Sequence, residues 1–321
     1  MSTVLPQRFQ ILSLDGGGIR GVFTAAILAS IEEDRSVCIC DHFDLIAGTS
    51  TGGIIAIALG LGIRPREILD FYIEHGPTIF ANRAGVRNFL HWMRRKYSGV
   101  GLQRALRSIL GDRAFGDSAK RLVIPSFNIA ANDVYIFRTP HLEYLRRDYR
   151  VPAWQVAMAT ASAPTFFPAF GGLDRLRLID GGVWANNPSM VAYVEAVGSL
   201  LVPSEHVAML SIGTMTGLRT YGKGLDRSGK LGWARHASTV IMDATSTGIN
   251  NQVHRLLGAE RYLRVNVVAS EHSVALDRVS TVDDLLAFAK HDSRKAIPHI
   301  SRMFLDHQAT LYEPLYRNDE R

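Results

Sequence analysis

A serine flanked by glycines has the spacing expected of an activated nucleophile. The segment is Gly48-Thr49-Ser50-Thr51-Gly52, a G-x-S-x-G pattern. It follows a short apolar run at 43–47 and precedes a longer one at 54–61, which predicts a strand, a sharp turn and a helix. In such a turn the serine hydroxyl projects from the sheet edge, while small residues let strand and helix pass closely. The pattern therefore indicates that Ser50 is a nucleophile supported by Gly48 and Gly52.

A glycine-rich loop precedes this serine and supplies what it lacks. Residues 9–15 alternate like a buried strand, and the loop Gly16-Gly17-Gly18-Ile19-Arg20-Gly21 leads into a helical pattern at 22–33. Backbone N–H groups of consecutive glycines can converge on an oxyanion without obstruction by side chains. One such donor is typically worth roughly 2.7–4 kcal/mol in the transition state. We predict an oxyanion hole formed by Gly16, Gly17 and Gly18 at the strand end next to Ser50.

The same loop also matches the dinucleotide fingerprint G-x-G-x-x-G. That fingerprint needs an acidic residue about twenty positions on, at the end of the second strand. Asp41 and Asp44 precede or open that strand, and its end carries Gly48 and Ser50 instead. The pair of motifs favours a hydrolase, and a dinucleotide-binding protein is the alternative from a different class.

Ser50 needs a base, and Asp180 is the favoured one. A short strand delivers it to the turn Gly181-Gly182, where close backbone approach is possible. Taken alone, this Asp-Gly pattern is the ordinary turn of a hairpin. A histidine base would satisfy the order Ser, Asp, His, but no candidate follows a clear strand in a short glycine-bounded loop. Those candidates are His206, His236, His254, His272, His291, His299 and His307.

A second serine, Ser162, lacks flanking glycines and a preceding strand. It follows the small-residue helix expected at 154–161. A hydroxyl at a helix end is the favoured interpretation.

The elements that must position these residues alternate between strand and helix. After the serine helix we expect a helix from 64 to about 74, stopped by His75-Gly76-Pro77, and another at 99–110. Strands are expected at 122–128 and 134–138. Further on, 231–257 is expected to be helical, 262–268 a strand, and 281–305 one or two amphipathic helices. The alternation predicts a three-layer α/β domain with a mostly parallel sheet.

Four blocks in this order resemble the signature of the patatin-like phospholipases. They are Asp15 to Gly21, Gly48 to Gly52, Ala161-Ser162-Ala163-Pro164-Thr165-Phe166-Phe167-Pro168, and Asp180-Gly181-Gly182. The resemblance covers about Phe9 to Thr214, including Ser211-Ile212-Gly213-Thr214. We therefore expect a patatin-like catalytic core at 9–214. Residues 215–321 are expected to form an extension packed on the same domain and to be a candidate regulatory region.

The resemblance implies the three-layer α/β/α patatin-like fold and a Ser–Asp dyad lipid acyl hydrolase of phospholipase A type. It implies no metal and no cofactor. Ser50 would be the nucleophile, Asp180 the base, and the N–H groups of Gly17 and Gly18 the oxyanion hole. Arg20 matches the family's arginine in the glycine block.

The composition favours a reducing compartment for this protein. The chain has 321 residues, 47% hydrophobic and 21% charged, which suits one large α/β domain. Its two cysteines, Cys38 and Cys40, are too close to bridge, so a disulfide framework is excluded. No signal-peptide core precedes Phe9, and the longest apolar run, 54–63, is too short to span a bilayer. We expect a cytoplasmic protein that is peripheral at the inner membrane when active.

Excess positive charge is concentrated between residues 83 and 121. The formal charge is +6, and this stretch holds ten basic residues against Asp112 and Asp117. The basic residues are Arg83, Arg87, Arg94, Arg95, Lys96, Arg104, Arg107, Arg113, Lys120 and Arg121. A solvated helical face is one interpretation, and an anionic membrane surface or ligand is the other. Interleaved Phe89, Leu90, Trp92 and Met93 favour a phospholipid membrane surface. Nucleic acid is not expected, because no reading module is present.

Control of such an enzyme is expected, since it would attack its own membrane. The chain's size and residues 215–321 resemble bacterial patatin effectors of anti-phage signalling that cyclic nucleotides activate. This implies a cyclic di- or trinucleotide activator, with Lys223, Arg227 and Lys230 in a glycine-rich loop as candidate contacts. A constitutive lipase or esterase is the alternative. The sequence is compatible with an oligomer.

Overall fold

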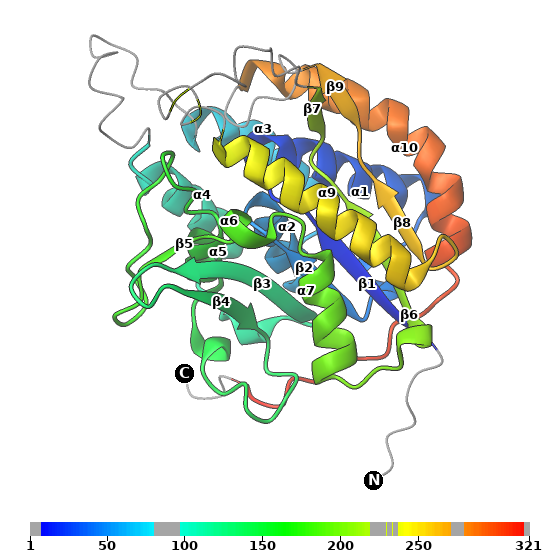
Figure 1. The fold of residues 1–321 in the computed structure, drawn as a ribbon, viewed down its shortest axis with the longest axis horizontal. Helices are drawn as coiled ribbons and strands as arrows, with labels where there is room; N and C mark the ends of the chain where they lie inside the picture. Colours follow the sequence, from blue (N-terminus) through cyan, green and yellow to red (C-terminus); the bar gives the residue numbers. More distant parts are fainter. Residues whose placement is uncertain are drawn as a thin grey trace.

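The computed structural model describes residues 8–79, 97–218, 229, 233, 237–270 and 279–317. Within them, one seven-stranded sheet has the order β4-β3-β2-β1-β6-β8, with β5 also paired to β3 (Figure 1). Five strands are mutually parallel, and β4 and β5 run antiparallel to β3. The strands are β1 (Phe9–Leu14), β2 (Leu45–Gly48), β3 (Arg121–Asn128), β4 (Asp133–Arg138), β5 (Leu178–Asp180), β6 (Val207–Ile212) and β8 (Tyr262–Val265). The expected mostly parallel sheet is confirmed.

Both faces of this sheet are covered by helices. Along β1, Leu12 and Leu14 enter one apolar cluster and Phe9 and Ile11 the other, as the two-residue period of a strand requires. Helices α1 (Gly21–Arg35), α2 (Thr51–Gly60) and α10 (Val282–Phe304) cover the first face. Helices α7 (Ser189–Val194) and α9 (Ala237–Leu257) cover the second and lie in front of the sheet in Figure 1. This is the expected three-layer α/β/α arrangement.

Shorter elements complete the described chain. Three helices, α3 (Pro65–Ile79), α4 (Val100–Leu110) and α5 (Ala153–Thr160), add to the first face, and α6 (Gly182–Ala185) follows β5. A separate two-stranded parallel sheet pairs β7 (Thr216–Leu218) with β9 (Val268–Ser270). Single-turn helices occur at Gly18–Arg20, Ile39–His42, Phe115–Asp117, Asp148–Arg150, Ser204–His206 and Val279–Thr281, with a π-helical segment at Glu195–Ser199.

The described residues beyond 214 contribute to the same layers as those before it. Strand β8 extends the main sheet beside β6, and α10 packs along α1 (Figure 1). The segment that was expected to be an extension therefore supplies an edge of the central sheet and a helix of its first face.

Two expected boundaries were wrong. Helix α3 continues past His75-Gly76-Pro77 to Ile79. Gly76 packs against the single-turn helix Gly18–Arg20, where a Cβ would lie 2.8 Å from Ile19 Cδ1. Close packing therefore explains this glycine better than helix termination does.

The expected strand 262–268 is divided into β8 and β9. The side chain of Asn266 accepts from Met215 N–H and donates to the Thr216 hydroxyl. These bonds draw the chain out of the main sheet and towards β7. Periodicity alone did not reveal this long-range contact.

Candidate active site

Ser50 occupies the turn between β2 and α2. Its backbone has φ 55° and ψ −122°, a conformation that is costly for a residue with a side chain. Hydrogen bonds hold it there: Ser50 N–H donates to Thr160 Oγ1 at 3.0 Å, and that hydroxyl donates to Pro125 O at 2.7 Å. The strained turn is thus tied to α5 and β3.

Glycines at 48 and 52 are required by the close passage of the backbone. A Cβ at Gly48 would lie 2.1 Å from Gly52 O, and one at Gly52 would lie 2.2 Å from Leu14 O. No side chain fits either position without moving backbone. The arrangement has the geometry of a nucleophile elbow.

Asp180 reaches Ser50 because β5 continues along β3 where β2 stops. Strand β2 pairs with β3 up to Ala47 opposite Val123, and β5 begins its own pairing at Asp180 opposite Ser126. The two strands run in opposite directions, so their carboxyl ends meet. Ser50 follows the end of β2 by two residues, which brings it to the end of β5.

The carboxyl group of Asp180 is buried and hydrogen-bonded. Its residue is 5% exposed and Ser50 is 8% exposed. Burial raises the pKa of Asp180 to about 6, opposed by hydrogen bonds from the Ser50 hydroxyl and from Gly182 N–H at 2.7 Å. A carboxylate with that pKa is ionised at neutral pH and is basic enough to accept a proton.

Glycines after Asp180 also have a steric reason. A Cβ at Gly181 would lie 2.3 Å from Pro125 O, and one at Gly182 would lie 3.0 Å from Asp180 Oδ1. The turn therefore places the carboxylate against the backbone of β3. Ser162 lies nearby as a helix-end residue, with its hydroxyl donating to Met158 O at 2.7 Å, as expected.

The glycine loop lies directly against Ser50. A Cβ at Gly16 would lie 3.2 Å from Ser50 Cβ and 2.5 Å from Asn186 Oδ1, and one at Gly17 would lie 2.2 Å from Thr214 Oγ1. Gly18 has φ 58°. Within the described part of the chain, the N–H groups of Gly17 and Gly18 have no hydrogen-bond acceptor. The expected contribution of Gly16 is not supported, because its N–H already donates to Asn186 O at 2.9 Å. Two backbone donors beside the serine are the requirement for an oxyanion hole.

Side-chain donors hold the carbonyl groups of this loop in place. Gly16 O accepts from the Thr214 hydroxyl at 2.7 Å, and Gly17 O accepts from Arg20 Nε at 3.2 Å. Arg20 also donates to Met215 O at 2.7 Å. Arg20 therefore ties the loop to the segment after β6.

Sequence reasoning missed a buried ion pair at the start of the loop. Both carboxylate oxygens of Asp15 bind the guanidinium of Arg264 on β8, with Nη1 to Oδ1 at 2.8 Å. The pair borders a cavity of about 130 Å³, which Asn186, Thr214 and Asn266 also line. A charged residue inside an otherwise apolar strand was the signal that could have drawn attention to Arg264.

The alternatives to the dyad find no support near Ser50. Among the described residues, no histidine is hydrogen-bonded to Ser50. His307 binds Asp44 at 2.8 Å, at the amino end of β2, and His236 and His272 lie outside the described residues. Asp44 lies at the same amino end. The carboxyl end of β2, where a dinucleotide-binding protein would need its ribose-binding acid, carries Gly48 and Ser50 instead.

Several of the basic residues after 100 have structural partners. Arg107 stacks over Trp154, Arg113 donates to three carbonyl groups including Leu61 O, and Arg121 lies over Tyr312. Arg94, Arg95, Lys96 and the loop candidates Lys223, Arg227 and Lys230 lie outside the described residues. For Arg107, Arg113 and Arg121, contacts within the fold are a structural reason for the basic residue.

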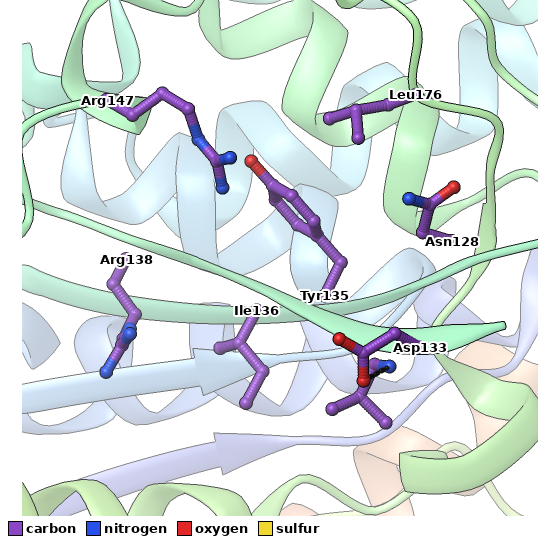
Figure 2. Close-up of a pocket in the computed structure, with 8 residues that line it drawn as sticks. Asn128, Asp133, Tyr135, Ile136, Arg138, Arg147 and Leu176 are labelled. Atoms are coloured by element: carbon purple, nitrogen blue, oxygen red, sulfur yellow. Dashed lines mark hydrogen bonds between the residues drawn. The ribbon is translucent and has the colours of Figure 1, made fainter. Parts of the chain in front are cut away.

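A second depression lies along the edge strand β4. Figure 2 shows this groove of about 460 Å³, with Arg147 directed towards Tyr135 and Arg138 farther along the strand. Arg147 stacks over the Tyr135 ring and pairs with Asp148, while Arg138 pairs with Glu195. The groove contains neither dyad residue.

The described residues contain neither a membrane-spanning helix nor a cluster of metal-binding side chains. No helix there combines the length and apolar character needed to cross a bilayer. No group of three or more His, Cys, Asp or Glu side chains there is arranged to hold a metal ion.

Comparison with known proteins identifies relatives over nearly the whole chain. The model of the family described as "Patatin-like phospholipase" matches residues 12–193. A protein named "cGAMP-activated phospholipase" from Pseudomonas aeruginosa (strain BWHPSA011 / Pa011) is 33% identical over 94% of this chain and 93% of its own length. "Patatin-like protein 1" of Arabidopsis thaliana is 30% identical over 96% of this chain and 86% of its own. The crystal structure of VipD from Legionella pneumophila aligns with 92% of this chain and 67% of its own, at 10% identity and TM-score 0.47, too distant to support an argument.

Proposed function

The chain belongs to the patatin-like phospholipase family and is a lipid acyl hydrolase, and we propose that a Ser50–Asp180 dyad cleaves the acyl esters of membrane phospholipids. The observation that carries this proposal is the meeting of two buried side chains, Ser50 and Asp180, at the ends of β2 and β5, where the Ser50 hydroxyl acts to lower the pKa of the Asp180 carboxyl. Ser50 also lies beside a glycine loop in which the N–H groups of Gly17 and Gly18 are available to an oxyanion.

The proposed first half-reaction acylates the serine. Asp180 accepts the hydroxyl proton as Ser50 Oγ attacks the ester carbonyl carbon. The carbonyl oxygen becomes an oxyanion that accepts from the N–H groups of Gly17 and Gly18. The C–O bond to the lysophospholipid then breaks, and the leaving alkoxide takes the proton from Asp180.

Water completes the cycle by the same groups. Asp180 takes a proton from water, whose oxygen attacks the acyl carbon, and the second oxyanion uses the same two donors. Collapse breaks the bond to Ser50 Oγ, which regains its proton, and the fatty acid is released. Each half-reaction therefore uses the same general base, Asp180, and the same oxyanion hole.

Substitution of each dyad residue tests the assignment. Ser50→Ala and Asp180→Asn should each abolish phospholipid hydrolysis in a folded protein, and the double variant should be no worse, because the two act as a unit. Ser162→Ala is the matched control and should retain activity. Hydrolysis by Asp180→Asn at the wild-type rate would exclude this base and revive a histidine.

Activation by a cyclic nucleotide is proposed from the relatives, several of which are named cGAMP-activated phospholipases. A hundredfold activation requires about 2.7 kcal/mol of preference for the active state. Turnover of phospholipid should rise with cGAMP or another member of a panel of cyclic di- and trinucleotides. Calorimetry on Ser50→Ala would separate binding from catalysis. Full basal turnover with no binding heat for any nucleotide would leave a constitutive lipase.

Docking on anionic phospholipid is proposed for the basic stretch before residue 97. Reversal of Arg94, Arg95 and Lys96 to Glu should weaken vesicle sedimentation and vesicle hydrolysis, at about 1 kcal/mol per residue. Hydrolysis of a soluble ester should not change. Reversal of Lys290, Arg294 and Lys295, exposed on α10, is the control of equal charge. Equal losses on both substrates would indicate a defect of the fold or site instead.

A cytoplasmic enzyme that acts peripherally at the inner membrane would suit anti-phage defence. We propose this role from the same relatives. Bacteria expressing the wild-type protein with a matching nucleotide synthase should form fewer phage plaques than those expressing Ser50→Ala. Equal plaque counts would contradict the role without touching the hydrolase assignment.

A further inference from the structure

Asp15 connects the glycine loop to the far edge of the sheet. It immediately precedes Gly16, and its N–H donates to Ile212 O at 3.0 Å. The residue is 3% exposed, so an unpaired carboxylate would be costly at this position. Its partner, Arg264, has a side chain only 16% exposed. Both oxygens of Asp15 are engaged by this one guanidinium.

A polar layer built across three strands holds Arg264 in turn. Ser13 on β1, Ser211 on β6 and Arg264 on β8 are register partners, so their side chains share one face. Arg264 Nη1 donates to Ser211 Oγ at 2.7 Å, and Ser189 Oγ on α7 lies 3.0 Å from Ser211 Oγ and donates to Ser13 Oγ at 2.9 Å. This chain of bonds fixes the guanidinium towards Asp15 and away from solvent.

Arg264 also determines the charge next to the oxyanion hole. Burial lowers the pKa of Arg264, but Asp15 and Tyr262 together raise it by more, so the guanidinium stays charged. It balances the carboxylate, which would otherwise be a buried negative charge next to Gly16. Such a charge would oppose a developing oxyanion a few residues away.

We propose that Arg264 is a positioning residue for the hydrolase reaction, acting through Asp15 to hold the glycine loop against Ser50. This rests on the proposed dyad and oxyanion hole. Arg264 lies beyond residues 12–193, which match the family model, so a segment outside that match completes the site.

The first test separates a catalytic effect from a structural one. Arg264→Gln should lower kcat for a soluble short-chain ester about ten- to a hundredfold, less than the hundred- to thousandfold expected when an oxyanion donor is lost. KM should stay within about twofold, because the loop acts in the transition state. Arg264→Lys keeps the charge but loses the bidentate fork, so it should recover part of kcat.

Arg261 provides a matched control. Arg261 immediately precedes β8, and its side chain donates to the carbonyl groups of Ser204 and Val207. Arg261→Gln should lower the thermal midpoint comparably while kcat per folded molecule stays unchanged. If Arg264→Gln shows wild-type kcat per folded molecule, the proposal is overturned.

A double-mutant cycle tests the route through Asp15. If Arg264 acts through this carboxylate, Arg264→Gln should cost little more in an Asp15→Asn background. The same fold loss in both backgrounds would overturn the proposal. If Arg264→Gln does not fold, the same comparison of kcat is made with Arg264→Lys in the wild-type and Asp15→Asn backgrounds. Fluorophosphonate labelling and ester turnover by the wild type are measured first, in the presence of each member of the nucleotide panel, and the absence of both with every nucleotide would refute the proposed function instead.

Discussion

An Asp180→Asn substitution should make the protein more stable while it removes the general base. Asn has nearly the same shape as Asp, and its Oδ1 can still accept from Gly182 N–H. What disappears is the cost of ionising a buried carboxyl. Its pKa is raised from 3.8 to about 6, which corresponds to about 3 kcal/mol of unfolding free energy at neutral pH.

The gain should depend on pH in a defined direction. Because the pKa of Asp180 is higher in the folded than in the unfolded protein, the contribution of this carboxyl to wild-type stability is fully present below about pH 4. This contribution is lost as the pH rises through about 6, and it changes little at higher pH. The difference between variant and wild type should therefore be close to zero at pH 4 and reach its maximum above pH 7.

Urea denaturation between pH 4 and 8 measures this difference. Asp70→Asn, which removes an exposed charge on α3, controls for net charge. A stability difference that is flat with pH, or equal to that of Asp70→Asn, would mean that Asp180 is not held in a costly ionised state. The reasoning about its pKa would then be wrong.

Three further outcomes are expected. Hydrolysis of a soluble ester should fall tenfold per pH unit below about pH 6, since Asp180 must be ionised, and a flat profile from pH 5 to 8 would contradict this. Gly48→Ala should cost about 3 kcal/mol or more in urea denaturation. Gly248→Ala, where a Cβ meets open space on α9, should gain up to about 1 kcal/mol, and equal effects would contradict the steric argument. Activity should survive excess EDTA because the proposed oxyanion donors are N–H groups, whereas loss restored by calcium would contradict that mechanism.

The parts of the site that were predictable from sequence are those set by local sterics. Gly48 must be glycine because its own turn brings Gly52 O within 2.1 Å of a Cβ, whereas Gly52 is constrained by Leu14 O of the neighbouring strand β1 at 2.2 Å. The alternation of strand and helix predicted the layers for a similar reason, since each element's apolar period is local. Local demands leave a pattern in adjacent residues.

The parts that could not be predicted depend on pairing between distant segments. Arg264 meets Asp15 across 249 positions, and only the register of β1, β6 and β8 brings them together. Thr160, which accepts from Ser50 N–H, lies 110 positions away. A strand ending in Asp180 was expected, but not that it would continue along β3 where β2 stops.

The strand order also has a consequence for the time at which the enzyme becomes active during synthesis. Strand β1 emerges from the ribosome first, yet it lies between β2 and β6, and β6 begins only at Val207. At bacterial or eukaryotic elongation rates, the interval between Ser50 and Val207 lasts roughly ten to thirty seconds. Throughout it the nascent chain carries the serine without a completed central sheet. We expect ribosome-bound chains that end before Val207 to hydrolyse no ester, so translation itself delays the hazard until the molecule is nearly finished.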